Sequence, residues 1–259
     1  MHNLLKQRIN DGEKVIGAFI GIYSPSIIEM LGYAGYDFVV IDDEHGAFSY
    51  SELENLIRTA DSVGITPIVR VSYDESSIQK ALDRGAKGIQ VPMVNTPEDA
   101  KEVVRKATFP PIGTRGAAYS HRAARYGKDS GEDFLESSND SILIIVHIET
   151  PEAVRNFEEI INISGIDIAF IGSTDLSVNM GYKNGPNNAE VQDTIRILFE
   201  KGEKANTLMG TVAGDSEGAC KALAQGANFV GIVSSNMISN VFSNSLNMVR
   251  KHIKSVTYR

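Results

Sequence analysis

A glycine repeatedly separates a helical pattern from a short apolar run along this chain. The pattern occurs five times, in the stretches GYDFVVI, GITPIVRV, GAKGIQV, GIDIAFIG and GANFVGIV, which begin at Gly35, Gly64, Gly85, Gly165 and Gly226. Glycine at such a position ends a helix because it adopts a positive φ without a steric penalty, and the apolar run that follows is typical of a buried strand. Helices that alternate with buried strands favour a parallel sheet.

Three further apolar runs, at 15–23, 142–149 and 208–212, bring the expected strands to eight. Eight such units in a chain of 259 residues predict an α/β fold, a single (β/α)8 TIM barrel that spans residues 1–259 as one domain. An open doubly wound sheet is the alternative. The sequence contains no dinucleotide-binding fingerprint that would support that open form.

Composition and charge narrow the class of partner and the compartment. The 33 acidic and 25 basic residues give a formal charge of −8, which argues against nucleic acid as a partner. The single cysteine, Cys220, excludes an internal disulfide framework and a cysteine-rich zinc site. No apolar run approaches the roughly 18 residues of a membrane span, and residues 1–12 do not resemble a signal peptide. We therefore expect a cytoplasmic protein with no membrane partner.

Two segments do not fit a plain alternation of strand and helix. About 33 residues separate the helical pattern that ends near Ala107 from the run at 142–149, which is long for a connection and predicts an active-site cover. The last helical segment carries an apolar stripe, for which packing on its own barrel is the simplest interpretation. The stripe consists of Ile238, Val241, Phe242, Leu246, Val249 and Ile253.

Active sites of such barrels lie at the carboxyl ends of the strands, so polar residues at those ends are the candidates. They are Asp42, Glu44, His45, Arg70, His147, Glu149 and Asp175. His147 and Glu149 are two residues apart in an extended run, so both side chains face the barrel interior. A buried carboxylate needs a metal ion or an arginine beside it.

A divalent metal is one explanation for Glu149, with Asp175 as the second ligand. Two carboxylates, completed by water and a chelating substrate, suit Mg²⁺ or Mn²⁺. The alternative is an ion pair between Glu149 and Arg70, with Asp175 only capping a helix. The turn Gly172-Ser173-Thr174 opens a short helical stretch, whose free N–H groups suit a carboxylate or phosphate, although such residues also serve as ordinary caps.

Six further candidates have proton-transfer or anion-binding chemistry. His45 is a candidate general base that Asp42 would orient, and Arg70 suits a ketone oxygen or a developing enolate. The loop residues Arg115, His121, Arg122 and Arg125 are candidates for an anionic substrate tail, although exposed basic loop residues are usually only solvated.

Several stretches, in order and spacing over nearly the whole chain, resemble the HpcH/HpaI aldolase family. They are Asp42-Asp43-Glu44-His45, Pro67-Ile68-Val69-Arg70, Leu82-Asp83-Arg84-Gly85-Ala86, Val91-Pro92-Met93-Val94, Phe109-Pro110-Pro111-Ile112-Gly113-Thr114-Arg115-Gly116, Ile148-Glu149 and Gly172-Ser173-Thr174-Asp175-Leu176-Ser177.

The resemblance implies a class II pyruvate aldolase that uses Mg²⁺, Mn²⁺ or Co²⁺ and cleaves a 4-hydroxy-2-oxo acid to pyruvate and an aldehyde through a metal-bound enolate. Relatives of this kind act on 4-hydroxy-2-oxoheptanedioate or 2-keto-3-deoxy sugar acids and form hexamers by exchanging the terminal helix. Carried over by position, the resemblance implies that the metal ligands are Glu149 and Asp175. The implied catalytic residues are His45, Asp42, Arg70 and Asp83, and Asp83 would act at the site of a neighbouring subunit. The implied substrate-binding residues are Arg70, His147, Gly172, Ser173, Thr174 and Val212.

Four positions depart from the family pattern. The family usually has Gly at Asp43, Gln at His147, Pro at Ser173 and a Gly-x-Asp pattern at residues 233–235. His147 would then act as a third ligand or replace a water-mediated contact. These departures affect the expected substrate more than the expected reaction.

Two other functions stay open. A lyase of the citrate-lyase or malyl-CoA-lyase type would apply the same enolate chemistry to a coenzyme A thioester, although the short chain shows no added segment for the nucleotide. A barrel that binds an oxo acid without converting it is the second. No lysine lies at a predicted strand end, which favours the metal route over a Schiff base.

Overall fold

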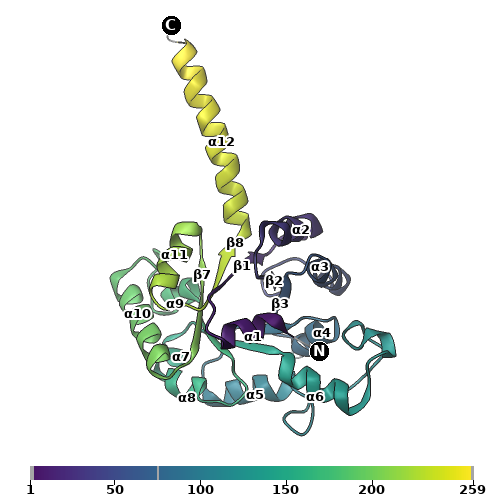
Figure 1. Cartoon of the computed structure of the whole chain (residues 1–259). Helices are drawn as coiled ribbons and strands as arrows, with labels where there is room; N and C mark the ends of the chain where they lie inside the picture. The colour runs from purple at the N-terminus through teal and green to yellow at the C-terminus, as the bar shows by residue number, and fades with distance from the viewer. Residues whose placement is uncertain (1–2, 75, 258–259) are drawn as a thin grey trace.

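The strands of the protein form a closed parallel barrel in the order β1 to β8 (Figure 1). The computed structural model describes residues 3–74 and 76–257. Pairing of β1 with β8 closes the sheet, so the predicted (β/α)8 barrel is confirmed and the open sheet is excluded. The strands are β1 (Val15–Ile20), β2 (Phe38–Asp42), β3 (Thr66–Arg70), β4 (Gly88–Val91), β5 (Leu143–Ile148), β6 (Ile168–Ile171), β7 (Leu208–Ala213) and β8 (Phe229–Val233).

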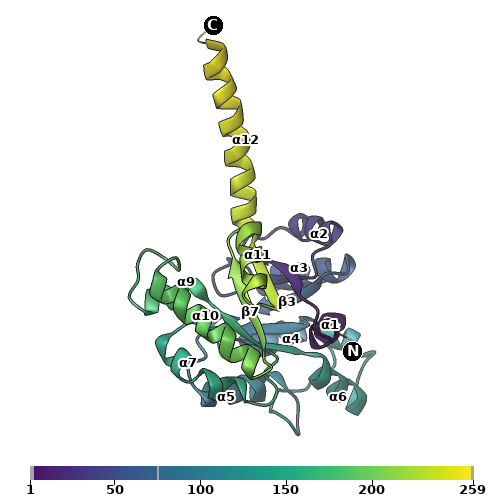
Figure 2. The same cartoon turned by 60° about the vertical axis from the view of Figure 1, so that its left-hand side comes forward.

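Helices surround the barrel, and one short helix lies across its amino-terminal end (Figures 1 and 2). That short helix is α1, whose Leu5 and Ile9 pack with the side chains inside the barrel. The helices are α1 (Leu4–Asn10), α2 (Pro25–Ala34), α3 (Tyr50–Ser62), α4 (Ser77–Asp83), α5 (Pro97–Ala107), η1 (Arg122–Gly127), α6 (Gly131–Ser141), α7 (Pro151–Arg155), α8 (Phe157–Ile161), α9 (Ser173–Asn179), α10 (Ala189–Lys204), α11 (Ser216–Ala224) and α12 (Ser234–Thr257).

The glycines that separate helix from strand adopt the left-handed conformation that the sequence pattern requires. Gly35, Gly64, Gly85, Gly165 and Gly226 have φ angles of 89°, 76°, 100°, 99° and 109°. A side chain is strained at such angles, so these positions direct the chain from each helix into the next strand.

The inside of the barrel is filled by phenylalanine rings that occupy space left by glycines. A Cβ atom on Gly17 would lie 2.2 Å from the Phe38 ring, and one on Gly231 would lie 2.5 Å from the Phe19 ring. Phe38 stacks on Phe229 with ring centroids 3.8 Å apart. This packing closes the barrel beneath the polar residues at the carboxyl ends of the strands.

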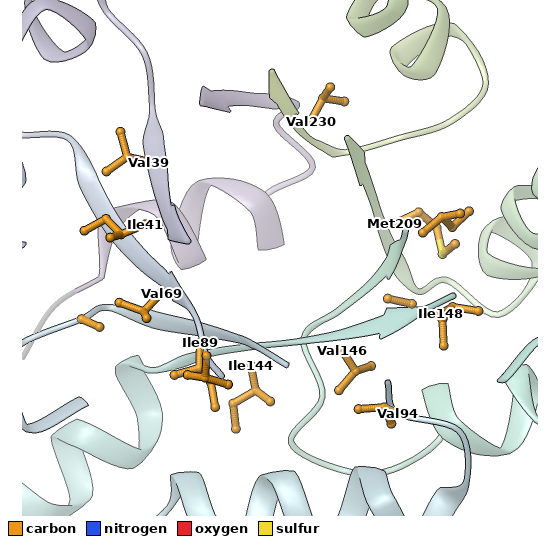
Figure 3. Close-up of a cluster of buried hydrophobic side chains, with 14 of the residues drawn as sticks. Val39, Ile41, Val69, Ile89, Val94, Ile144, Val146, Ile148, Met209 and Val230 are labelled. Carbon is orange, nitrogen blue, oxygen red and sulfur yellow. The ribbon is translucent and has the colours of Figure 1, made fainter. Parts of the chain in front are cut away.

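A second, larger core lies between the barrel and the surrounding helices (Figure 3). It contains the alternate, outward-facing residues of the strands. Val39, Val69, Ile89 and Val146 are examples, and none exposes any surface. The strict alternation between the two cores determines which strand residues point into the barrel.

The terminal helix α12 extends away from the barrel (Figures 1 and 2). Its side chains Val241, Phe242, Leu246 and Val249 are 65%, 70%, 50% and 54% exposed. The interpretation that this stripe packs on its own barrel is therefore wrong. A helix that begins directly at the end of β8 and continues straight for 24 residues leaves the barrel surface behind.

The segment between α5 and β5 is not a plain loop, because it contains η1 and α6. It packs through Phe109, Ala124 and Phe134, which form a small core of their own. Among the described residues, no helix combines the length and apolarity needed to cross a bilayer.

Candidate active site

A cavity of about 330 Å³ lies at the carboxyl ends of the strands. It brings together ten of the predicted site residues, which lie at or just after the ends of β2, β3 and β5, in β7, and at the start of α9. They are Asp42, His45, Arg70, His147, Glu149, Gly172, Ser173, Thr174, Asp175 and Val212. Phe19 and Phe170 form apolar walls, and Val233 and Ser235 complete the lining on the β8 side.

Arg70, at the end of β3, is held by two carboxylates. Its Nε and Nη2 donate to Asp42 Oδ1 and Oδ2 at 2.8 and 2.6 Å, and its Nη1 lies 3.2 Å from Glu44 Oε2. Burial opposes the charge on the guanidinium, but Asp42, Glu44 and Glu149 outweigh it and raise the pKa of Arg70. The guanidinium is thus a fixed cation with N–H groups left for a substrate oxygen.

His45 has a different partner from the one expected. The carboxylate of Asp42 is engaged by Arg70, and its Oδ1 also accepts the backbone N–H groups of Glu44 and His45 at 3.3 Å. The His45 ring Nε2 lies 3.8 Å from Glu44 Oε2. Asp42 therefore shapes the loop and holds Arg70, whereas Glu44 is the acid that the ring faces.

The Glu149 carboxylate is held from two sides. His147 Nδ1 lies 2.9 Å from its Oε2, and the backbone N–H of Met93 donates to its Oε1 at 2.7 Å. Because an ionised carboxylate only accepts hydrogen bonds, Nδ1 of His147 carries the proton. Burial raises the pKa of Glu149, but these two donors and Arg70 together bring it below its usual value. The alternative ion pair between Glu149 and Arg70 is not formed, because Arg70 pairs with Asp42 and Glu44 instead.

His147 is oriented by packing as well as by Glu149. Its ring stacks on Phe170, with centroids 4.8 Å apart and planes 21° apart. Only 1% of its side chain is exposed, and its Nε2 has no hydrogen-bond partner among the described residues. With Nδ1 on the carboxylate, His147 in this arrangement positions Glu149.

Gly172 allows the two nominated metal ligands to share the cavity. A Cβ atom on Gly172 would lie 2.4 Å from Glu149 Oε2, so any other residue would displace this carboxylate. The same turn continues into α9, whose first turn carries Asp175. Asp175 and Glu149 therefore line one cavity from neighbouring strand ends.

The chemistry of these donors fits a divalent cation. The carboxylates of Asp42, Glu44 and Glu149 act on the guanidinium of Arg70, and Asp175 lines the same cavity. These four acids and one arginine give a net formal charge of −3 when both imidazoles are counted as neutral. Each oxygen of Glu149 uses one lone pair for a hydrogen bond and keeps another. In the described part of the chain no three acidic, histidine or cysteine side chains form a ready-made metal site, so water and substrate would complete the shell.

Several contacts of the site have no counterpart in a sequence pattern. Met93 adopts a φ of 55°, a rare value for a residue with a side chain, and this turns its N–H toward Glu149. Asn179 donates from Nδ2 to the Glu149 carbonyl at 3.0 Å. Desolvation, together with the nearby carboxylate of Glu44, raises the pKa of Tyr73 to about 12. No spacing in the sequence marks these contacts.

Asp83 and the loop arginines lie outside the cavity of their own chain. Asp83, the last residue of α4, accepts from Arg115 Nη2 at 2.8 Å and lies 3.5 Å from the His121 ring. Arg122 pairs with Asp61 at 2.6 Å, and Arg125 pairs with Asp129 on its own loop. In one chain this segment is therefore not a cover for the cavity, because its charged groups hold it against α3 and α4.

Comparison with known proteins shows which family shares this fold and these motifs. The HpcH/HpaI aldolase/citrate lyase family model matches residues 15–239. A 2-keto-3-deoxy-L-rhamnonate aldolase from Escherichia coli O17:K52:H18 is 34% identical over 238 residues, 91% of this chain and 88% of that protein.

Two solved structures agree closely with the barrel. An HpcH/HpaI aldolase/citrate lyase family protein from Burkholderia cenocepacia J2315 has a TM-score of 0.91 at 30% identity, over 96% of this chain and 99% of that one. The citrate synthase SbnG has a TM-score of 0.84 at 32% identity, over 96% and 98% of the two chains. The protein described here therefore belongs to the HpcH/HpaI aldolase/citrate lyase family.

Proposed function

We propose that the protein is a class II pyruvate aldolase, a carbon–carbon lyase that cleaves a 4-hydroxy-2-oxo acid to pyruvate and an aldehyde. The observation that carries the proposal is the cavity that Glu149, Asp175 and the fixed guanidinium of Arg70 line together. Relatives named 2-keto-3-deoxy-L-rhamnonate aldolase support a deoxy sugar acid as the substrate.

The residues of the cavity divide the reaction between them. Arg70 would donate an N–H to the keto oxygen, and the backbone N–H groups of Ser173 and Thr174 would bind the substrate carboxylate. His45 would take the proton of the C4 hydroxyl. The C3–C4 bond then breaks, the aldehyde leaves, and the electron pair remains on pyruvate as its enolate, which gains a proton at C3.

A divalent cation on Glu149 and Asp175 would supply the additional positive charge that stabilises the enolate oxygen. His147 and Met93 would hold Glu149 in place for it, and Gly172 would leave the necessary room. Mg²⁺, Mn²⁺ and Co²⁺ are the proposed ions.

Release of pyruvate tests this proposal. Purified protein, freed of metal and then supplied with Mg²⁺, Mn²⁺ or Co²⁺, is mixed with 2-keto-3-deoxy-L-rhamnonate, and pyruvate is measured with lactate dehydrogenase. We expect release that depends on the added ion and is reduced at least about 1000-fold in Glu149→Gln. Glu54→Gln, a change at a partly exposed residue of α3 that pairs with Arg58, is the matched control and should keep full activity. Equal release in Glu149→Gln and in the unaltered protein would contradict the proposed ligand.

The proposal includes assembly into a homohexamer in the cytoplasm. The exposed apolar stripe of α12 favours packing against a neighbouring subunit, because such surfaces are rarely left in water. A neighbour would also give Asp83 access to a cavity other than its own. The single cysteine, Cys220, is consistent with a reducing compartment.

A second candidate is a condensation of the kind catalysed by citrate synthases. One observation besides the likeness to SbnG favours it: a groove of about 500 Å³ adjoins the cavity and shares Ser173, Thr174, Val212 and Val233 with it. That groove would accept a long second substrate such as a coenzyme A thioester. Citrate formed from oxaloacetate and acetyl-CoA, without pyruvate release from any 4-hydroxy-2-oxo acid, would establish this candidate over the aldolase.

A further inference from the structure

Glu44 lies at the centre of the contacts around His45, although the proposed reaction gives it no role. Its Oε2 lies 3.2 Å from Arg70 Nη1 and 3.8 Å from His45 Nε2, so one oxygen faces both groups. The same carboxylate contributes to the raised pKa of the Tyr73 phenol, so that phenol is also near it. Only 9% of the Glu44 side chain is exposed, and its ion pair with Arg70 holds it at the edge of the cavity.

The His45 ring, by contrast, is exposed and needs an anchor. Its side chain is 63% exposed, and the 3.8 Å approach to Glu44 is its one charge contact among the described residues. A general base contributes to rate only if it is held within reach of the proton that it takes. An exposed imidazole without such an anchor samples several rotamers.

Asp42 is not available as that anchor. Both of its oxygens accept hydrogen bonds from Arg70, and Oδ1 also accepts two backbone N–H groups. A turn of its side chain toward the ring would break the bidentate pair with Arg70, which is the shortest ion pair in the site at 2.6 Å. Glu44 can hold the ring without any such loss.

We propose that Glu44 is the positioning residue of His45: its carboxylate keeps the ring at the cavity mouth and faces the positive charge that appears when the ring takes the substrate proton. This inference rests on the proposed aldolase function for its role in the reaction. The contact itself does not depend on that function. The same oxygen of Glu44 also pairs with Arg70. The two hydrogen bonds to Asp42 would still hold the guanidinium if Glu44 were absent.

The kinetics of Glu44→Gln show whether Glu44 acts through His45 or through Arg70. The amide keeps an acceptor for Arg70 and removes the charge that faces His45. We expect kcat for cleavage to fall about 10- to 100-fold while KM stays within about two-fold. Glu44→Asp restores a carboxylate and should recover part of the lost kcat. A rise in KM with unchanged kcat would assign Glu44 to Arg70 and overturn the inference.

Ring mobility tests the contact without any activity. Carbon-13 relaxation of the His45 ring, assigned with a His45→Gln variant, reports its order in the full-length protein. We expect lower ring order in Glu44→Gln and unchanged order in Asp42→Asn and in the surface control Glu54→Gln. The reverse result, with order lost in Asp42→Asn and kept in Glu44→Gln, would overturn the inference. If the unaltered protein keeps an ordered His45 ring, loses that order in Glu44→Gln and still releases no pyruvate, the aldolase function is refuted and the positioning contact stands.

Discussion

Replacement of Arg70 by methionine tests how the site is held together. The guanidinium is 13% exposed and is bound by Asp42 and Glu44, whose side chains are 10% and 9% exposed. Arg70→Met fills a similar space and leaves the largely buried carboxylates of Asp42 and Glu44 without a cation. Removal of one partner from a buried pair costs about 3–5 kcal/mol, so the free energy of unfolding should fall by that amount.

Urea denaturation measures this loss. With an m-value of about 2 kcal/mol/M, the midpoint should fall by about 1.5–2.5 M, and a domain with a total stability of about 5–15 kcal/mol remains folded. The double variant Arg70→Met with Asp42→Asn should regain part of the loss, because one stranded charge is gone. The control is Arg196→Met, which removes two exposed ion pairs on α10, with Asp193 and Glu200, and should cost less than about 0.5 kcal/mol. A loss below about 1 kcal/mol in Arg70→Met would refute the electrostatic account of the site.

Three further predictions concern other parts of the molecule. Gly231→Ala places a Cβ atom 2.5 Å from the Phe19 ring, so overpacking should cost about 1–3 kcal/mol in urea denaturation, and an unchanged midpoint would contradict the inner-core packing. The pKa of Tyr73 is raised to about 12, so the high-pH absorbance titration should contain a late phenol transition that is missing in Tyr73→Phe. In Glu44→Gln this transition should move toward pH 10. The stability that this phenol contributes is present below its unfolded pKa and is lost as the pH rises through its folded pKa of about 12. Phe242→Glu introduces a charge on the exposed stripe of α12 and should yield a smaller species in sedimentation velocity; an unchanged mass would show that this face is not an interface.

The barrel was predictable because local rules and the global fold agree along this chain. Each of the five glycines that follow a helical pattern has the positive φ that its position implies, as Gly85 with its φ of 100° shows. Alternation along β5 placed His147 on the face of Glu149, and the 2.9 Å contact between them follows from that alternation. Both rules depend only on neighbours in the sequence.

The pairings inside the site were not predictable, because they depend on distances between strands. Asp42 is three residues from His45, yet it binds Arg70, the residue opposite it in the register of β2 and β3. The N–H of Met93 reaches Glu149 only because its backbone adopts a φ of 55°. The direction of α12 is likewise decided by the exit angle from β8, which no apolar stripe can indicate.

Exchange of the C3 protons of pyruvate with solvent tests the central claim most directly, because it requires the enolate but no aldehyde. The protein is incubated with pyruvate in D₂O with Mg²⁺, Mn²⁺ or Co²⁺, and the loss of the methyl signal is followed by proton NMR. We predict exchange that depends on the ion, is abolished by Glu149→Gln and is strongly slowed by Arg70→Met. Absence of exchange in the folded, metal-supplied protein would contradict the enolate chemistry proposed for this cavity.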